Sequence, residues 1–287
     1  MTLHQLLSEG TDALNGAGTP EADLDARQLL FEAFHTDTVH FLMNRMQQLS
    51  KTPETDAMAA DYRRMIKERC RRIPIQHILG SQEFMGLTFK VNRHVLIPRQ
   101  DTETLVELVL EEQKDAGKRV LDLCTGSGCI AISLAVKGGY EDVTAADLSE
   151  DALKVAEENG KRLLGSQNLH LCQGDLFQAL QPGQKFDILV SNPPYIPTEV
   201  IKGLQPEVRD HEPMMALDGT EDGLAFYRRI AAEAGDWLNP GGSIYLEIGH
   251  DQGAAVSGLL RDAGFCNIKV VKDLPGLDRV VRADYEP

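Results

Sequence analysis

The chain has 287 residues and carries 44 acidic against 29 basic side chains, a formal net charge of −15. This length suffices for about two domains with buried cores, and we expect neither a signal peptide nor a membrane span, which needs roughly 18 consecutive apolar residues. Five cysteines without paired spacing disfavour a disulfide framework or a zinc finger, so we expect reduced cysteines in a cytoplasmic protein. The excess of acidic side chains disfavours a protein that wraps nucleic acid.

Residues 1–80 have the spacing of amphipathic helices. Leucine recurs at positions 3, 6, 7 and 14, which predicts a first helix. A second helix is predicted to begin at Thr19-Pro20, with Thr19 as its N-terminal cap, and a third at Thr52-Pro53, ending before Pro74. We therefore expect a small helical domain over this segment.

Residues 81–98 change to the two-residue period of β-strands. Apolar side chains from Phe84 to Val91, followed by Val95 and Ile97, predict two short strands with a turn at Asn92-Arg93-His94. We expect a β-hairpin that links the helical domain to residues 99–287.

From Lys118 onward, apolar segments rich in Val, Ile and Leu alternate with helical segments. Continuous apolar strands separated by helices are typical of a parallel sheet covered by helices on both faces. The sequence therefore predicts an α/β fold with a doubly wound, mostly parallel, seven-stranded Rossmann-like sheet. The predicted strands are 120–124, 143–147, 169–172, 186–191, 243–248, 268–271 and 279–282.

The first of these strands runs into a turn at Cys124-Thr125-Gly126-Ser127-Gly128, directly before a helix. Glycines at a strand-to-helix turn allow a ligand to approach the helix N-terminus. Asp147 ends the next strand, 21 residues after Gly126, where a carboxylate can accept hydrogen bonds from both ribose hydroxyls. Because Cys124 stands where a dinucleotide fingerprint has its first glycine, we predict a nucleoside cofactor without phosphates, S-adenosylmethionine.

Asp175 and Leu176 follow the third predicted strand. Asp175 is placed to accept a hydrogen bond from an adenine amino group. An N-terminal cap for the helix around Phe177–Leu180 is an equal alternative, and one carboxylate could serve both roles.

The fourth strand ends in Asn192-Pro193-Pro194-Tyr195, the most informative tetrapeptide of the chain. Two prolines remove two N–H donors and leave carbonyl acceptors, while Asn192 adds a side-chain acceptor and Tyr195 a flat surface. This set suits a planar –NH₂ group, whose delocalised lone pair it would aim at an electrophilic methyl group. We expect no metal and no nucleophilic serine or cysteine, since the eight histidines are dispersed and no nucleophile motif is present.

Further segments accompany the tetrapeptide: 75–80 (IQHILG), 83–86 (EFMG), 96–103 (LIPRQDTE), 121–128 (LDLCTGSG), 190–196 (VSNPPYI), 222–224 (DGL), 241–242 (GG) and 247–249 (EIG). Together they resemble the class I methyltransferases and, more closely, the release factor glutamine N5-methyltransferase family. Methyltransferases that act on adenine or cytosine amino groups share the tetrapeptide alone. The Ile-Pro-Arg and Glu-Phe-x-Gly elements narrow the resemblance to this family.

The resemblance implies transfer of a methyl group from S-adenosylmethionine to the side-chain amide of the glutamine in the Gly-Gly-Gln motif of peptide chain release factors. It implies a helical substrate-recognition domain over residues 1–80, a linker over 81–98 and a methyltransferase domain over 99–287; a monomer is the simpler expectation. The implied catalytic residues are Asn192, Pro193 and Tyr195, with Pro194 added for substrate binding. The implied cofactor-binding residues are Cys124, Thr125, Gly126, Ser127, Gly128, Asp147, Asp175, Leu176 and Asn192.

Two positions depart from the family pattern. Cys124 replaces the usual glycine, and Leu176 stands where some members carry an aromatic residue beside adenine. The family pattern also places the Pro98–Glu103 loop over the active site. The alternative for Arg99 and Glu103 is an exposed ion pair beside an N-terminal cap by Asp101.

An N6-adenine methyltransferase acting on DNA or RNA would use the same tetrapeptide but would need a basic surface for phosphates. Residues 1–80 carry 11 acidic and 9 basic side chains, so residues 81–287 carry 33 and 20 and hold −13 of the net −15. That sign repels a polyanion and favours a protein substrate. A nicotinamide dehydrogenase is disfavoured by the broken glycine pattern, and a non-catalytic nucleoside-binding module would leave the tetrapeptide without a role.

Overall fold

The computed structural model describes residues 1–165 and 169–287. The chain forms two compact units, which we describe separately. The helical unit consists of residues 1–80 and 205–211, and the sheet unit of residues 81–204 and 212–287. In the described part of the chain, no helix combines the length and the apolar character needed to cross a membrane.

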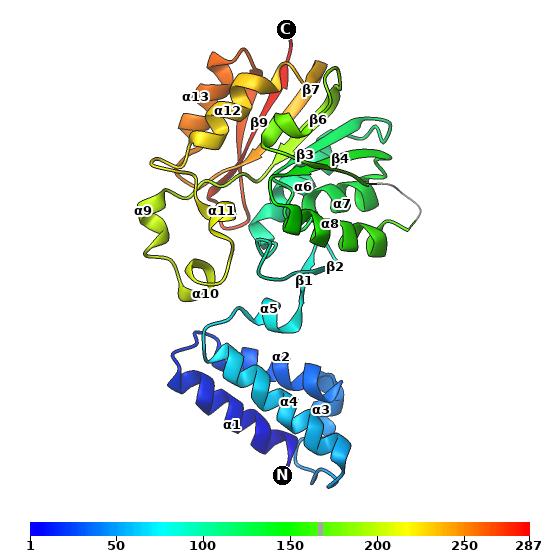
Figure 1. The fold of residues 1–287 in the computed structure, drawn as a ribbon, viewed down its shortest axis with the longest axis vertical. Helices are drawn as coiled ribbons and strands as arrows, with labels where there is room; N and C mark the ends of the chain where they lie inside the picture. Colours follow the sequence, from blue (N-terminus) through cyan, green and yellow to red (C-terminus); the bar gives the residue numbers. More distant parts are fainter. Residues whose placement is uncertain (166–168) are drawn as a thin grey trace. The chain divides into compact units, whose positions relative to one another are not determined.

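The helical unit surrounds a core of mostly aliphatic side chains, to which Phe41 and Tyr62 also belong. Its helices are α1 (Leu3–Gly16), α2 (Ala22–Phe34), α3 (Thr38–Asn44), α4 (Pro53–Arg69), α5 (Ile75–Leu79) and the short α10 (Pro206–Arg209) (Figure 1). Leu6, Leu14, Leu29, Leu30 and Tyr62 are fully buried between them. The predicted α1, α2 and α4 are present, whereas α3 and α5 were not predicted.

The predicted start of the second helix is wrong by two residues. Helix α2 begins at Ala22, and Thr19 does not cap it. Thr19 instead completes the end of α1, because Gly18 has a φ of +71° and the Thr19 amide donates to the Leu14 carbonyl at 3.0 Å. Thr52 caps α4 through its side chain, as predicted.

A buried ion cluster fixes the 205–211 segment within the helical unit. Glu207 on α10 accepts hydrogen bonds from Arg69 Nη1 at 2.8 Å and from Arg72 Nε and Nη2 at 2.6 Å. Arg69 Nε also donates to Asp25 at 2.7 Å, and both of these side chains are buried. Burial alone would raise the pKa of Glu207, but hydrogen bonds from Arg72 and Arg69 outweigh it and hold the pKa at about 2.

Glu207→Gln is expected to lower the free energy of unfolding at pH 7 by about 3 kcal/mol, because two arginines lose a charged partner in a buried site. The folded pKa lies below the ordinary value of 4.5, so the carboxylate stabilises the fold above about pH 4.5 and this contribution is lost as the pH falls towards 2. Urea unfolding at about pH 7 and about pH 3 measures both effects, with Glu32→Gln, an exposed glutamate of α2, as control. A difference between wild type and variant that persists unchanged into acid contradicts this account.

In the described residues, the sheet unit is built on a seven-stranded sheet with the order β5-β4-β3-β6-β7-β9-β8. Strands β3 to β7 run parallel, and β9 is antiparallel to both of its neighbours. The strands are β3 (Arg119–Leu123), β4 (Asp142–Asp147), β5 (Leu169–Gln173), β6 (Phe186–Ser191), β7 (Leu238–Glu247), β8 (Cys266–Lys272) and β9 (Asp278–Tyr285). The predicted doubly wound, mostly parallel α/β fold is confirmed.

Helices cover both faces of this sheet (Figure 1). Successive side chains of β3 point to opposite faces: Leu121 and Leu123 join the core beneath α12 (Ala225–Ala234) and α13 (Gly253–Asp262), whereas Val120 joins the core beneath α6 (Gln100–Glu112) and α7 (Cys129–Ser133). The remaining helical elements are α8 (Glu150–Leu163), α9 (Thr198–Ile201), α11 (Met214–Leu217), a π-helical turn at 134–138 and a 3₁₀ turn at 176–179.

The predicted hairpin is present with a different turn. Strands β1 (Ser81–Phe84) and β2 (Leu87–Lys90) pair around Met85-Gly86, whose positive φ angles of 53° and 68° match the twist of a two-residue hairpin. Asn92-Arg93-His94 is not the hairpin turn, because beyond Lys90 the chain leaves the ladder. The Lys90 amide and carbonyl are instead bonded by the side chain of Asn159 at 2.7 and 3.0 Å.

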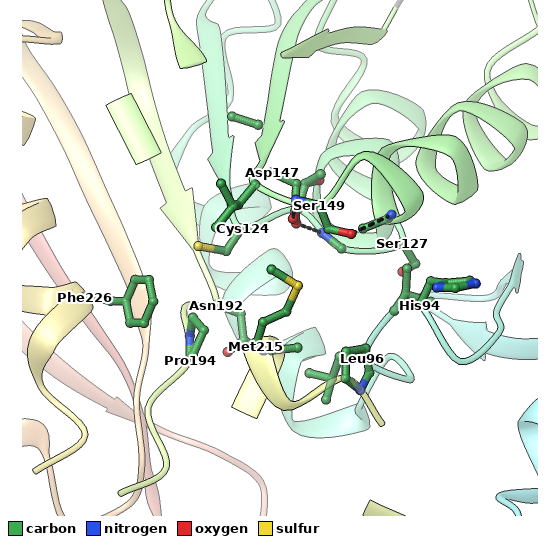
Figure 2. Close-up of a pocket in the computed structure, with 18 of the residues that line it drawn as sticks. His94, Leu96, Cys124, Ser127, Asp147, Ser149, Asn192, Pro194, Met215 and Phe226 are labelled. Atoms are coloured by element: carbon green, nitrogen blue, oxygen red, sulfur yellow. Dashed lines mark hydrogen bonds between the residues drawn. The ribbon is translucent and has the colours of Figure 1, made fainter. Parts of the chain in front are cut away.

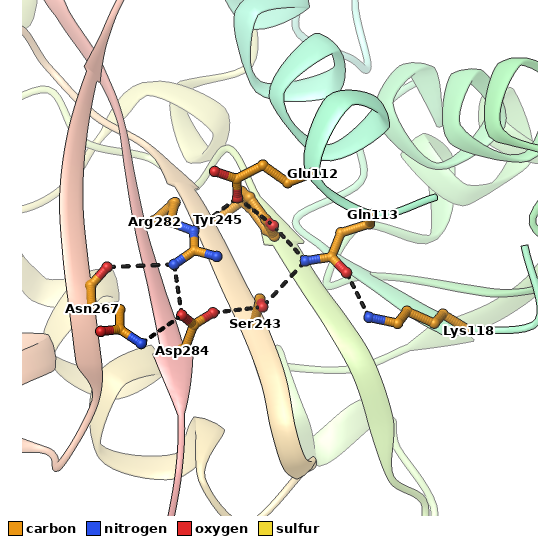
Figure 3. Close-up of polar contacts among 8 residues, drawn as sticks. All are labelled: Glu112, Gln113, Lys118, Ser243, Tyr245, Asn267, Arg282 and Asp284. Atoms are coloured by element: carbon orange, nitrogen blue, oxygen red, sulfur yellow. Dashed lines mark hydrogen bonds and ion pairs between the residues drawn. The ribbon is translucent and has the colours of Figure 1, made fainter. Parts of the chain in front are cut away.

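Polar contacts tie the C-terminal end of α6 to the sheet (Figure 3). Arg282 of β9 donates to Glu112 at 2.8 Å and to Asp284 at 2.7 Å, and Gln113 donates to the Tyr245 hydroxyl at 2.8 Å. Since the other end of α6 borders the cavity described next, this network fixes the helix that carries part of the site.

Candidate functional site

A cavity of about 520 Å³ lies at the carboxyl ends of the parallel strands (Figure 2). Open α/β sheets bind ligands at this edge, and the volume suits a ligand of cofactor size. Of the predicted site residues, those that line the cavity are Cys124, Thr125, Gly126, Ser127, Asp147, Asp175, Leu176, Asn192 and Pro194. Gly128, Pro193 and Tyr195 are not among its lining residues.

The turn after β3 lies directly against Asp147. The Gly126 amide donates to Asp147 Oδ2 at 2.8 Å, and the Ser149 amide donates to Oδ1 at 2.9 Å. Both carboxylate oxygens keep further lone pairs for a ligand. Gly126 has a φ of +56°, and a Cβ there would project into open space. Burial raises the pKa of Asp147, although both backbone amides lower it.

A second buried carboxylate, that of Asp122 on β3, accepts a hydrogen bond from this turn. Thr125 Oγ1 donates to Asp122 Oδ2 at 2.6 Å, and burial raises the pKa of Asp122 to about 7. Gly128 begins α7 with a φ of +79°, and a Cβ there would lie 2.9 Å from Ile132. Gly128 therefore serves the packing of the helix, which explains its absence from the cavity lining.

Cys124 adopts a backbone conformation that favours glycine. Its φ is +60°, in the left-handed region, and its side chain lies at the cavity wall (Figure 2). Burial, together with the nearby carboxylates of Asp147 and Asp122, raises the pKa of the Cys124 thiol. The departure from the family pattern thus has a structural cost, because a left-handed conformation costs an L-residue roughly 1–2 kcal/mol.

We expect Cys124→Gly to be more stable than Cys124→Ala by about 1 kcal/mol. In ordinary strands and helices alanine is the more stable of the two, so a reversed order isolates the backbone strain. Chemical denaturation of both variants measures the difference. Equal stability, or a more stable alanine variant, contradicts the assignment of strain to this residue.

Asp175 lies on the cavity wall and pairs with Arg229 Nη2 at 2.9 Å. Asp175 is the N-cap residue of the 3₁₀ turn that follows, as the alternative predicts, but its side chain makes no capping hydrogen bond. Leu176 is buried beside it with a φ of +50°. Left-handed residues other than glycine are concentrated at functional sites, and three of them, Cys124, Leu176 and Thr220, line this cavity.

Asn192 reaches the cavity from the end of β6 (Figure 2). Ser191 Oγ donates to the Leu123 carbonyl at 2.7 Å, which joins the ends of β6 and β3. Asn192 Nδ2 donates to Thr102 Oγ1 at 3.3 Å. The remaining polar atom of this side chain, Oδ1, is an acceptor, which is what a substrate N–H requires.

Tyr195 belongs to the support of the tetrapeptide. Its hydroxyl donates to Glu247 Oε1 at 3.4 Å, its ring packs against the hydrophobic core, and Gln252 Nε2 donates to its carbonyl at 3.1 Å. Gly223 has a φ of +72°, and a Cβ there would lie 2.2 Å from the Tyr195 carbonyl. The 222–224 motif therefore owes its glycine to close approach to the tetrapeptide.

The Pro98–Glu103 loop borders the cavity, and its charged residues have distinct partners. Arg99 lines the cavity and donates to Glu212 at 2.5 Å, a carboxylate whose side chain is buried. Glu103 accepts a hydrogen bond from the Met85 amide at 2.5 Å and so holds the hairpin turn. Asp101 does not cap α6, so the alternative of a cap with an exposed ion pair is wrong.

Sequence reasoning missed several lining residues. Met214, Met215 and Phe226 reach the cavity from the segment after α10, and Thr102 from the first turn of α6. The motifs at 96–103 and 222–224 are signals for Thr102 and Phe226. Nothing in the local pattern marks the two methionines, because their place depends on long-range packing.

Comparisons with known proteins agree with this geometry. Residues 5–80 match the family model "PrmC N-terminal domain", and residues 100–203 match "Methyltransferase small domain". The release factor glutamine methyltransferase of Geobacter sulfurreducens is 41% identical over 280 residues, which cover 98% of this chain and 95% of that protein. That of Moorella thermoacetica is 43% identical over 281 residues, which cover 97% of each. The chain belongs to the release factor glutamine methyltransferase family.

The family resemblance seen in the motifs is thereby confirmed over the full length of the chain. The fold is shared more widely: the crystal structure of a methyltransferase from Pyrococcus furiosus matches with a TM-score of 0.53 at 20% identity, covering 70% of this chain and 90% of that one. The sequence motifs of the release factor glutamine methyltransferase family, and not the fold, therefore distinguish this chain among methyltransferases.

Proposed function

We propose that this protein transfers a methyl group from S-adenosylmethionine to the side-chain amide nitrogen of the glutamine in the Gly-Gly-Gln motif of peptide chain release factors. The observation that carries the proposal is the orientation of Asn192, whose Nδ2 is bonded to Thr102, so that Oδ1 is left to accept from a substrate –NH₂. The names of the full-length relatives support the choice of glutamine over other amino groups.

The cavity fits S-adenosylmethionine. Gly126 leaves open space where a side chain would otherwise stand, and Asp147 keeps lone pairs on both oxygens for two ribose hydroxyls. Leu148 and Leu176 offer apolar surface for adenine, and Asp175 offers an acceptor for its amino group. When bound, the cofactor supplies a methyl group on a positively charged sulfur, which needs no further activation.

The chain's own residues bind and aim the substrate amide. Asn192 Oδ1 and the Pro193 carbonyl each accept a hydrogen bond from one N–H of the substrate amide. These two hydrogen bonds fix the amide nitrogen and its delocalised electron pair relative to the bound cofactor. Pro194 contributes apolar surface that excludes water, and Tyr195 holds the backbone of the tetrapeptide. No side chain needs to act as a strong base, because an N-methylated amide cation loses its proton readily to water.

The alternative acceptor is the N6 amino group of adenine in DNA or RNA. Incubation of the protein with labelled S-adenosylmethionine and, separately, a release factor, duplex DNA and ribosomal RNA distinguishes the two. We expect label on the release factor alone. Label on nucleic acid without label on the release factor would refute the proposed function.

We further propose that residues 1–80 form the substrate-recognition domain, 81–98 the linker and 99–287 the catalytic domain. The edges of the family-model matches at residues 80 and 100 support these boundaries. We propose that the protein acts as a cytoplasmic monomer without stable nucleic-acid binding, in keeping with its net charge of −15. Light scattering of the purified chain, alone and with the release factor, tests the monomer.

A further inference from the structure

One segment of the cavity wall is not used by the mechanism above. It consists of the short helix α11 (Met214–Leu217) and the residues on either side of it, and we call residues 212–220 the cavity strap. The residues of the cavity strap that line the cavity are Pro213, Met214, Met215, Ala216, Asp218 and Thr220. A stretch that supplies so much of the lining is a candidate for contact with a ligand.

The C-terminal end of the cavity strap is bonded to the chain that follows the tetrapeptide. The Ile196 amide donates to the Leu217 carbonyl at 3.0 Å, and the Gly219 amide donates to the Ile196 carbonyl at 2.9 Å. The Thr198 amide donates to the Thr220 carbonyl at 3.0 Å. Thr220 has a φ of +72°, which a β-branched residue keeps only when its surroundings enforce it. The cavity strap and the tetrapeptide are therefore held in one fixed arrangement.

The N-terminal end of the cavity strap is held by a charged hydrogen bond. Glu212 Oε1 accepts from Arg99 Nη2 at 2.5 Å, and only 1% of the Glu212 side chain is exposed. Between the two ends, the Asp218 amide donates to the Met214 carbonyl at 3.0 Å and closes a helical turn. The backbone of the cavity strap thus cannot withdraw from the cavity without breaking these bonds.

Two methionines of the cavity strap stand at the entrance of the cavity. Met214 and Met215 belong to the cavity lining, yet 53% and 50% of their surfaces are exposed. Figure 2 shows the Met215 side chain pointing into the cavity, whose wall also includes Asn192 and Pro194. Exposed apolar surface at the mouth of a binding cavity is typical of a surface that a ligand covers.

The acceptor site determines which part of the substrate reaches this entrance. In the proposed function, Asn192 Oδ1 binds the side-chain amide of the substrate glutamine inside the cavity. Only two methylene groups separate that amide from the glutamine main chain. The main chain must therefore lie at the cavity entrance, against the side chains that are exposed there. Glycine lacks a Cβ and allows a main chain to approach such side chains closely.

We propose that Met214 and Met215 are specificity-determining residues that form an apolar wall for the glycine directly before the substrate glutamine. The inference rests on the proposed function and deepens it, because it states how the enzyme reads the motif beyond the glutamine itself. Met215 packs against the glutamine methylenes and the glycine Cα. A side chain in place of the glycine hydrogen meets the two methionines, whose backbone is fixed at both ends.

Methylation rates of two release factors, one with Gly-Gly-Gln and one with Gly-Ala-Gln, test the proposal. The wild-type enzyme is expected to prefer Gly-Gly-Gln in kcat/KM by about tenfold or more, the discrimination that one methyl group produces at an apolar site. With Met215→Ala the preference is expected to fall to about threefold or less, and Met214→Ala is expected to lower it as well. Any effect of alanine on the release factor itself is the same for all enzymes, so the change in preference isolates the contact.

Two further variants and one titration serve as controls. Met215→Leu keeps the bulk of the side chain and is expected to retain the wild-type preference. Leu274→Ala, which shortens an exposed side chain outside the cavity lining, is the matched control and is expected to leave both rates unchanged. Calorimetric titration of Met215→Ala is expected to give an affinity for S-adenosylmethionine within about threefold of wild type. An unchanged preference in Met215→Ala overturns the inference, and if cofactor affinity falls at the same time, Met215 serves the cofactor instead.

A measurement on the wild-type enzyme needs no variant to fold. Exposed methionines are oxidised by dilute hydrogen peroxide, and mass spectrometry of digested protein follows this at Met214 and Met215. With S-adenosylhomocysteine bound, the Gly-Gly-Gln release factor is expected to slow their oxidation about threefold or more, and the Gly-Ala-Gln release factor is expected to protect them less. Equal oxidation with and without the Gly-Gly-Gln release factor overturns the inference while the proposed function stands. A wild-type enzyme that leaves this release factor unmethylated overturns the proposed function itself.

Discussion

Replacement of Asn192 by alanine is expected to lower kcat for glutamine methylation about 100- to 1,000-fold, the loss typical when one preorganised polar contact to the reacting group is removed. Affinity for S-adenosylmethionine is expected to change by less than about threefold. The reason is geometric: Asn192 Nδ2 donates to Thr102, and Oδ1 is the one atom of this side chain that can accept from the substrate amide. Initial rates over a range of both substrates separate kcat from the two KM values.

Asn192→Asp is the informative companion. It keeps the acceptor but adds a charge that the Asn192 side chain lacks, so a partial loss is expected. If Asn192→Ala weakens cofactor binding as much as it lowers kcat, Asn192 serves chiefly the cofactor, and the role we assign to it is wrong.

Asp147→Ala is expected to weaken the binding of the other substrate, S-adenosylmethionine. Loss of charge-assisted hydrogen bonds to two ribose hydroxyls, each worth roughly 1.5–3 kcal/mol, is expected to raise the dissociation constant for S-adenosylmethionine at least about tenfold. Calorimetric titration of the free protein measures this without turnover. Because the Gly126 and Ser149 amides also lose their acceptor, Asp147→Asn is the second variant, since it retains one oxygen.

Asp151→Ala removes an exposed carboxylate from the first turn of α8 and is the control for charge. Its affinity for S-adenosylmethionine is expected to equal that of wild type. If Asp147→Ala binds the cofactor as tightly as this control does, the ribose contact does not exist.

The sheet was predictable from sequence because the strands between its two edges are buried on both faces and therefore appear as continuous apolar runs. The part of the cavity lined by the ends of β3 and β4 was also predictable, since the carboxyl ends of adjacent parallel strands meet at one edge of the sheet. Gly126 and Asp147, which are 21 residues apart in the sequence, are joined in the structure by a hydrogen bond of 2.8 Å. These features depend on local pattern and on general rules of sheet topology.

Features that depend on long-range contacts were not predictable in this way. The hairpin ladder ends at Lys90, where the side chain of Asn159, far along the chain, takes the backbone bonds of Lys90. Glu207 belongs to the helical unit although its segment, 205–211, lies far along the chain, and no local period marks its pairing with Arg69 and Arg72.

The residues that contact Tyr195 of the tetrapeptide, Glu247 and Gln252, were missed for a similar reason. The segment 247–249 contributes a carboxylate, and Gln252 an amide, to residues more than 50 positions earlier. A motif search identifies such residues as part of a family pattern but does not indicate what they touch. Their roles follow only when the end of β7 is seen beside the end of β6.

The central claim is that the acceptor is a glutamine side-chain amide in a release factor. Tandem mass spectrometry of a release factor, before and after incubation with this protein and S-adenosylmethionine, tests it directly. We predict one added methyl group on the glutamine of the Gly-Gly-Gln motif, absent when Asn192→Ala replaces the wild type. A methyl group on any other residue, or none on the release factor while duplex DNA becomes methylated, would contradict the account.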